Sequence, residues 1–113
     1  MRLRFGLTVT ILFASACSSV AGGNRLTLNN PIWDQVNVEI VVTKSANCAD
    51  RGPEFVSRKE VLIRKDKSES VDVPPEAAVC WRHDRNPNNP KAGDWTGWTR
   101  ATLYPGQSAE SDI

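Results

Sequence analysis

The chain has 113 residues, which is enough for one domain and too few for several. Its 14 basic and 13 acidic residues nearly cancel, and charges of both signs alternate along the chain instead of forming blocks. A protein that binds nucleic acid usually carries a basic face or stripe, so this pattern argues against a nucleic-acid partner.

A signal peptide for export is predicted at residues 1–16. Arg2 and Arg4 give it a positive start, an apolar stretch follows, and small residues at 14–16 suit the narrow cleft of a signal peptidase. The apolar stretch is too short for a membrane-spanning helix, which needs ~20 apolar residues, and no later segment approaches that length. We therefore expect an exported protein without a transmembrane span of its own.

The next residue, Cys17, refines this expectation. The sequence Ala14-Ser15-Ala16-Cys17 resembles the lipobox of bacterial lipoproteins, in which the cysteine carries lipid and becomes the mature N-terminus. The resemblance implies a membrane partner reached through a lipid on Cys17, and a domain in the bacterial cell envelope that faces the periplasm. Ordinary cleavage before Cys17, or after residue 21, remains the alternative and would give a soluble periplasmic or secreted protein.

Residues 17–24 are small and polar and predict a flexible tether. The domain is expected at 25–113, where most segments alternate apolar and polar residues with the period of two that is typical of half-buried strands. The predicted strands are 25–29, 36–42, 55–64, 70–73, 77–82, 98–104 and 108–113. No segment shows a helical period with caps.

Seven short strands separated by turn signals predict an all-β fold, specifically a small antiparallel β-sandwich. A partly closed barrel is the alternative. The turn from Leu103 to Ser108, with Pro105-Gly106 at its centre, resembles strand connections of immunoglobulin-like bacterial domains. That resemblance implies an immunoglobulin-like sandwich, and an architecture alone does not imply a function.

Cys48 and Cys80 are expected to form a disulfide. The chain has three cysteines, so lipidation or removal of Cys17 leaves these two as a pair in an oxidising compartment. Their bond would close a loop of about 33 residues and stabilise the domain by roughly 3–4 kcal/mol. The alternative is a metal site that also uses His83. Structural zinc usually takes four ligands and His83 is the only histidine, so we expect no metal.

The candidate ligand-binding residues are Trp95, Trp98, Asn88, Asn89 and Asp94, which lie in or just after a loop rich in Asn, Pro and Gly. An exposed tryptophan beside amide and carboxylate groups could stack on a sugar ring or anchor a partner protein. The competing interpretation is that the tryptophans fill the core of a small sandwich.

The sequence contains no phosphate-binding loop, dinucleotide fingerprint, metalloprotease helix or nucleophile elbow. We therefore expect neither an enzyme nor a cofactor. The enzyme alternative would rely on His83 and surface acids. The first hypothesis is a cell-envelope lipoprotein with a structural or protein-interaction role, and the second is a glycan- or peptide-binding module.

Overall fold

The computed structural model describes residues 24–113, so the predicted signal peptide, Cys17 and most of the predicted tether lie outside the described residues. Within that range the chain forms seven strands and no helix. The strands are β1 (Asn24–Asn30), β2 (Gln35–Thr43), β3 (Phe55–Arg64), β4 (Lys67–Val73), β5 (Ala78–His83), β6 (Thr99–Thr102) and β7 (Ser108–Asp112). The predicted all-β class is confirmed.

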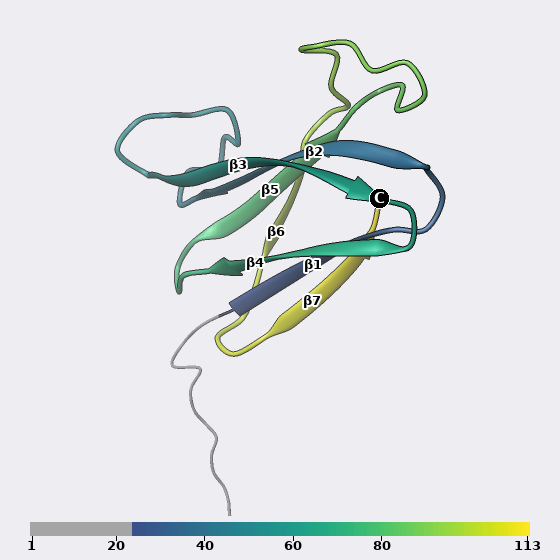
Figure 1. Ribbon diagram of the computed structural model, residues 1–113. Helices are drawn as coiled ribbons and strands as arrows, with labels where there is room; N and C mark the ends of the chain where they lie inside the picture. The colour runs from purple at the N-terminus through teal and green to yellow at the C-terminus, as the bar shows by residue number, and fades with distance from the viewer. Residues whose placement is uncertain (1–23) are drawn as a thin grey trace, which may run out of the picture.

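The strands form two sheets that face each other as the layers of a small sandwich (Figure 1). One sheet has the order β4-β1-β7 and the other the order β3-β2-β5-β6. All strand pairs are antiparallel except β1 with β7, which run parallel. In residues 24–113 no helix is long and apolar enough to cross a membrane.

The strand ends differ little from those predicted, with one instructive exception. β1 begins at Asn24, one residue inside the predicted tether. β4 begins at Lys67, not at residue 70, because the preceding turn needs only Lys65 and Asp66. Asp66 adopts a positive φ of 62°, a conformation that Asp tolerates better than most residues. The chain therefore reverses sharply and resumes strand pairing at once.

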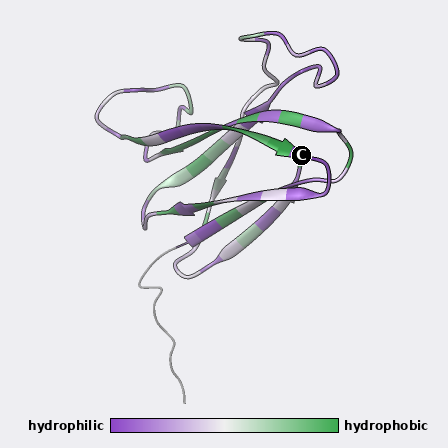
Figure 2. Cartoon of the chain, viewed as in Figure 1, coloured by the Kyte–Doolittle hydropathy of each residue, from purple (hydrophilic) through white to green (hydrophobic). Residues whose placement is uncertain are grey.

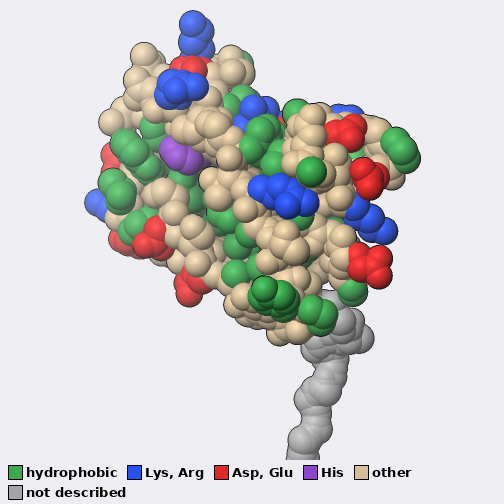
Figure 3. All heavy atoms as spheres, turned by 180° about the vertical axis from the view of Figure 1, so that it is seen from behind, with side chains coloured by type: hydrophobic (Ala, Val, Ile, Leu, Met, Phe, Trp, Pro, Cys, Tyr) green, Lys and Arg blue, Asp and Glu red, His purple; other side chains and the backbone are tan. Residues whose placement is uncertain are grey.

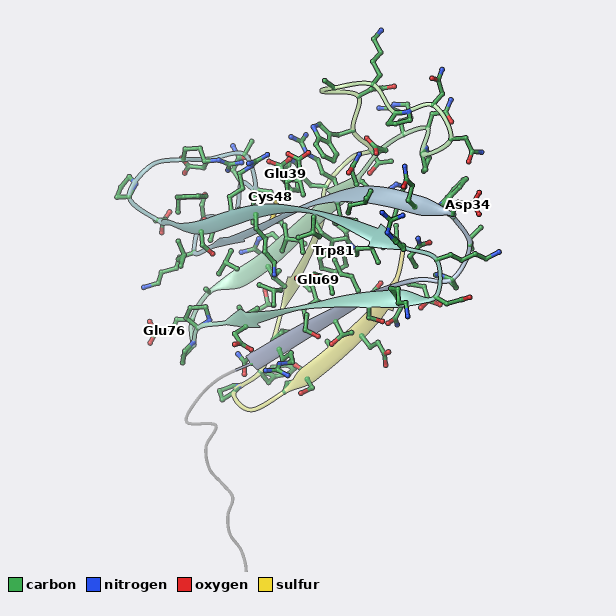
Figure 4. All side chains as sticks on the ribbon, viewed as in Figure 1. Asp34, Glu39, Cys48, Glu69, Glu76 and Trp81 are labelled. Carbon is green, nitrogen blue, oxygen red and sulfur yellow. A yellow bond between two sulfur atoms is a disulfide. The ribbon has the colours of Figure 1, made fainter. Side chains whose placement is uncertain are left out.

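The main hydrophobic core lies between the two sheets. Leu26 and Leu28 of β1 face alternate residues of β2, and all of these side chains are at most 1% exposed. Val79 and Trp81 of β5 share the same inner face, as their spacing predicts. Figure 4 shows Trp81 pointing into the space between the sheets, and Figure 2 shows hydrophobic and hydrophilic residues alternating along β2.

A buried asparagine holds the corner where the chain passes from the first sheet to the second. Asn30 is fully buried, and its Nδ2 donates to the carbonyl oxygens of Trp33 and Ile63, each at 2.9 Å. Its Oδ1 accepts the N–H of Trp33, also at 2.9 Å. A buried amide of this kind is tolerated only when it is hydrogen-bonded. These contacts fix the end of β1 against β3 and against the turn that leads into β2.

Candidate functional site

The outer face of the four-stranded sheet, turned away from the other sheet, is covered over β2 and β5, whereas its β3 margin stays partly exposed. Alternation along β2 places Glu39 and Val41 on this face. The register sets Glu39 opposite Arg82 of β5, and Val41 opposite Cys80. In Figure 4, Glu39 and Cys48 lie on this outer side, while Trp81 lies between the sheets. We call this region the covered face.

A buried carboxylate occupies the middle of the covered face. Glu39 is 3% exposed. Its Oε1 accepts a hydrogen bond from Arg82 Nε at 2.6 Å, and its Oε2 accepts one from Arg58 Nε. Arg51 Nη2 lies 3.8 Å from the same Oε2. Because Arg58 belongs to β3 and Arg82 to β5, this one side chain links three neighbouring strands.

The arginines control the ionisation of Glu39. Burial by itself would raise the pKa of Glu39, but the hydrogen bonds from Arg58 and Arg82 outweigh it and hold this pKa below its ordinary value. The contact with Glu39 in turn raises the pKa of Arg58. The carboxylate is therefore ionised at neutral pH, and its charge is matched locally by the guanidinium groups.

Arg82 also joins the two candidate tryptophans. Its guanidinium carbon lies 4.2 Å from the centre of the Trp98 ring and 5.3 Å from that of Trp95, both within cation–π range. Trp98 packs in turn against a small second core formed by Val41 and the two cysteines. Trp98 is therefore part of the packing around the disulfide, whereas Trp95 contacts this cluster through Arg82.

Cys48 and Cys80 form a disulfide, as the cysteine count predicts. Their Cα atoms are 6.0 Å apart, and the bond fastens the loop between β2 and β3 onto the covered face. The alternative metal site with His83 is wrong because both sulfurs are used in the bond. His83 instead hydrogen-bonds through Nδ1 with the carbonyl oxygen of Asp84 at 2.7 Å. In the described part of the chain, no three His, Cys, Asp or Glu side chains gather as metal ligands would.

A hollow of about 380 Å³ lies between the covered face and the loop that joins β5 to β6. Five side chains that carry its chemistry are Asn37, Arg58, Glu60, Asp84 and Trp95, and loop residues 90–93 form its rim. We call it the loop hollow. Its volume is at the lower end of the roughly 300–1,000 Å³ typical of ligand sites.

Asp84 forms the floor of the loop hollow and is 5% exposed. Its Oδ2 accepts the backbone N–H of Asn37 at 3.2 Å, and its own N–H donates to the Asn37 carbonyl at 3.0 Å. An isolated antiparallel bridge also joins Asp84 to Trp95. The base of the loop is therefore fixed to β2, which positions Trp95 at the wall of the hollow.

The predicted ligand residues do not all meet at one place. Trp95 and Trp98 are both half-buried, and only Trp95 lines the loop hollow. Asp94 lies next to Trp95 and pairs with Arg85, its Oδ1 being 3.1 Å from Nε.

The two predicted asparagines lie elsewhere on the loop. Asn88 and Asn89 are exposed, and Asn88 lines a different, smaller hollow with Asp34 and Gln35. Neither of them lines the loop hollow.

The sequence did not predict a ligand-binding role for Asn37, Arg58 and Glu60, which the sheet contributes, or for Asp84, which follows β5. The available signal was the polar positions of the strongest strand, where Asn37 and Glu39 alternate with valine and isoleucine. Those positions predict which side chains share the outer face of the strand, but not which loops cover that face. Together with Trp95, these side chains give the loop hollow hydrogen-bond donors, acceptors and one aromatic surface, which suit reversible binding of a polar ligand.

The fold and the site define a disulfide-bonded β-sandwich domain with one covered sheet face and a polar hollow beside an aromatic side chain. No family model, no curated protein and no solved structure matches this chain.

Proposed function

We propose that the protein is a small exported lipoprotein of the bacterial cell envelope, anchored through lipid on Cys17, with a non-enzymatic structural or protein-interaction role. The observation that carries the proposal is the Cys48–Cys80 disulfide. Such bonds persist in oxidising compartments and are rare in the cytosol. Their pairing leaves Cys17 as the one cysteine for lipidation, next to the lipobox-like residues.

The arrangement of the domain suits an N-terminal anchor. β1 begins at Asn24, at the end of the sandwich where the turn before β7 lies, and Arg25 N–H donates to the carbonyl of Gln107 at 3.2 Å. The loop that joins β5 to β6 lies at the opposite end (Figure 1). A membrane anchor ahead of Asn24 would therefore attach at the end of the sandwich opposite that loop, which leaves the loop hollow away from the point of attachment.

The surface charge is consistent with a domain that works near other envelope molecules. On the side seen in Figure 3, basic and acidic side chains are interspersed. Such a mixed surface limits non-specific attraction to anionic polymers. We therefore propose no nucleic-acid partner.

Intact mass spectrometry of the protein expressed in a bacterium tests this proposal. We expect a chain that begins at Cys17 and carries lipid, and thiol labelling of Cys48 and Cys80 only after reduction. The matched control is Cys17→Ser, which should lose the lipid and move from the membrane to the soluble fraction. A chain that retains residues 1–16 contradicts export. An exported chain without lipid supports the soluble periplasmic or secreted alternative.

The second candidate function is a glycan- or peptide-binding module. The specific observation in its favour is Trp95, which forms the wall of the loop hollow next to unused polar groups. This function is compatible with a lipid anchor, because Asn24, where the described chain begins, and the loop that joins β5 to β6 lie at opposite ends of the sandwich.

A further inference from the structure

We propose that the loop hollow binds one ring of an uncharged carbohydrate, with Trp95 as the stacking surface and Asn37, Glu60 and Asp84 as partners for its hydroxyl groups. The proposal rests on the second candidate function above and names its ligand class. It does not depend on whether Cys17 carries lipid.

The strongest observation is the carboxylate at the floor. Asp84 is 5% exposed, and only its Oδ2 has a hydrogen-bond partner within residues 24–113. Its other oxygen is left for a ligand in a hollow that the carboxylate itself lines. That oxygen is open to water, since Asn24 Oδ1 is the one fully buried polar side-chain atom without a partner in residues 24–113, and a donor on a ligand would take the place of the water. A hydroxyl group is such a donor.

The rest of the polar lining also has capacity to spare. The side-chain amide of Asn37 makes no hydrogen bond inside the described chain, although its backbone N–H and carbonyl are both bonded to Asp84. Glu60 uses Oε1 for Arg58, at 3.1 Å, which leaves Oε2. An amide both donates and accepts, whereas carboxylates accept only. A ring that bears several hydroxyl groups supplies both the donors and the acceptors that these side chains can use.

The charge balance of the hollow favours an uncharged ligand. Arg58 and Lys91 contribute two positive charges, and Glu60 and Asp84 contribute two negative charges. An acidic ligand would meet both carboxylates, and a basic ligand would meet both cations. Arg58 is in addition already engaged with Glu39 and Glu60, so it offers little to an anion. A neutral polyol avoids these like-charge contacts.

Trp95 is held in place before a ligand arrives. Arg82 lies over its ring, Glu39 fixes Arg82, and the bridge to Asp84 fixes the Trp95 backbone. A rigid aromatic wall loses little conformational freedom on binding, which preserves affinity. An indole presents an apolar surface with a polar edge, which suits a sugar ring whose faces are apolar and whose rim is hydroxylated.

The position of the hollow also distinguishes a sugar from an extended peptide. Peptides that add a strand need an unpaired sheet edge. The floor of the loop hollow lies over β2, whose backbone is paired on one side with β3 and on the other with β5. The edge strand β3 also contributes Arg58 and Glu60 to the lining, but its unpaired backbone edge lies in the plane of the sheet, whereas the hollow lies over the sheet face, where side chains make the contacts.

Isothermal titration of the mature processed protein tests the proposal. The probes are maltotriose, cellotriose and triacetylchitotriose, with an uncharged tripeptide for comparison. We expect saturable binding of at least one sugar, weakened at least tenfold by Trp95→Ala and by Asn37→Ala. Tyr104→Ala is the matched control, since it removes an aromatic that is 77% exposed outside the hollow. It should leave binding unchanged.

Trp95→Phe guards against a variant that fails to fold, and it should retain partial binding. Proton NMR spectra establish that each variant is folded. The proposal is overturned if none of the three sugars saturates, if the tripeptide binds and the sugars do not, or if folded Trp95 and Asn37 variants bind as well as the wild type. The mass measurement on Cys17 is independent, so failure of the anchor and failure of the sugar site are distinguishable.

Discussion

At the scale of single residues, Glu39 determines the character of the covered face. Removing a carboxylate from water costs free energy, and at this position two arginine hydrogen bonds offset that cost. The same arginines have second roles, because Arg82 supports the tryptophans and Arg58 contacts Glu60. A buried ion pair with shared partners is weak evidence for net stability but strong evidence that losing one member is harmful.

We predict that Glu39 makes the native protein sensitive to acid. Because folding lowers the pKa of Glu39, its ion pairs stabilise the native state above the ordinary pKa of about 4.5, and this contribution is lost as the pH falls through the lowered value. Glu39→Gln should lower the free energy of unfolding by about 2 kcal/mol at neutral pH. This value is kept small because Arg58 is partly exposed, and solvent screens its attraction to Glu39. The variant should also show a flatter stability profile in acid. Urea unfolding between pH 7 and pH 3 measures both effects.

Glu60→Gln is the control for this prediction, because Glu60 pairs with the same Arg58 but its side chain is 47% exposed. Exposed pairs contribute roughly 0–1 kcal/mol, so Glu60→Gln should leave the acid profile close to that of the wild type. If the stability of the wild type and of Glu39→Gln falls equally as the pH is lowered, the ionisation of Glu39 does not cause the acid sensitivity of the fold.

At the scale of elements, two loops cover a sheet face that an antiparallel sandwich often leaves to water. The loop between β2 and β3 is fastened by the disulfide, and the loop between β5 and β6 is fastened by Trp98 and Arg82. Val41 and the disulfide lie where these two loops meet. The disulfide is therefore the centre of a second core and also a cross-link.

We predict that loss of the disulfide weakens the whole domain. Its loop joins residues 32 apart in sequence, and chain-entropy arguments give a stabilisation of roughly 3–4 kcal/mol for a loop of that order. The double variant Cys48→Ala, Cys80→Ala should therefore unfold at lower urea concentration than the wild type. Equilibrium unfolding followed by tryptophan fluorescence measures the difference.

Wild-type protein unfolded in the presence of a reductant is the comparison for the double variant. Cys80 is fully buried and Cys48 is 6% exposed, so reduction should occur after unfolding and not in the native state. A double variant as stable as the oxidised wild type would show that the cross-link does not contribute to folding stability.

At the scale of the whole molecule, the strands were predictable and their partners were less so. The period of two in β1, β2 and β5 depends only on neighbouring residues, and each inner face follows from it. The burial of Glu39 could not be predicted, because it depends on Arg58, on Arg82 and on two distant loops. The polar residues at the start of β4 also concealed a strand, since an edge strand has one face in water.

The parallel pairing of β1 with β7 was likewise hidden from local patterns. The chain crosses from β6 in one sheet to β7 in the other, and β7 then lies beside the first strand. Nothing in the short, polar sequence of β7 specifies that partner. The pairing gives the C-terminal strand a structural role, because β1 would otherwise be an edge strand with its backbone groups unpaired.

We predict that the domain folds only when its last strand is present. A variant that ends at Gln107 loses five strand pairs to β1, the packing of Ala109 and Ile113 on the core, and the hydrogen bond from Ile113 N–H to the Asn29 carbonyl at 2.9 Å. A domain of this size has only roughly 5–15 kcal/mol of stability in total, so it should lack a cooperative unfolding transition. Glu110→Ser is the control: it removes one exposed contact to Asn29, 2.8 Å long, but keeps the backbone pairing, and should cost less than about 1 kcal/mol. A truncated chain that still unfolds cooperatively would mean that the remaining strands close the core without β7.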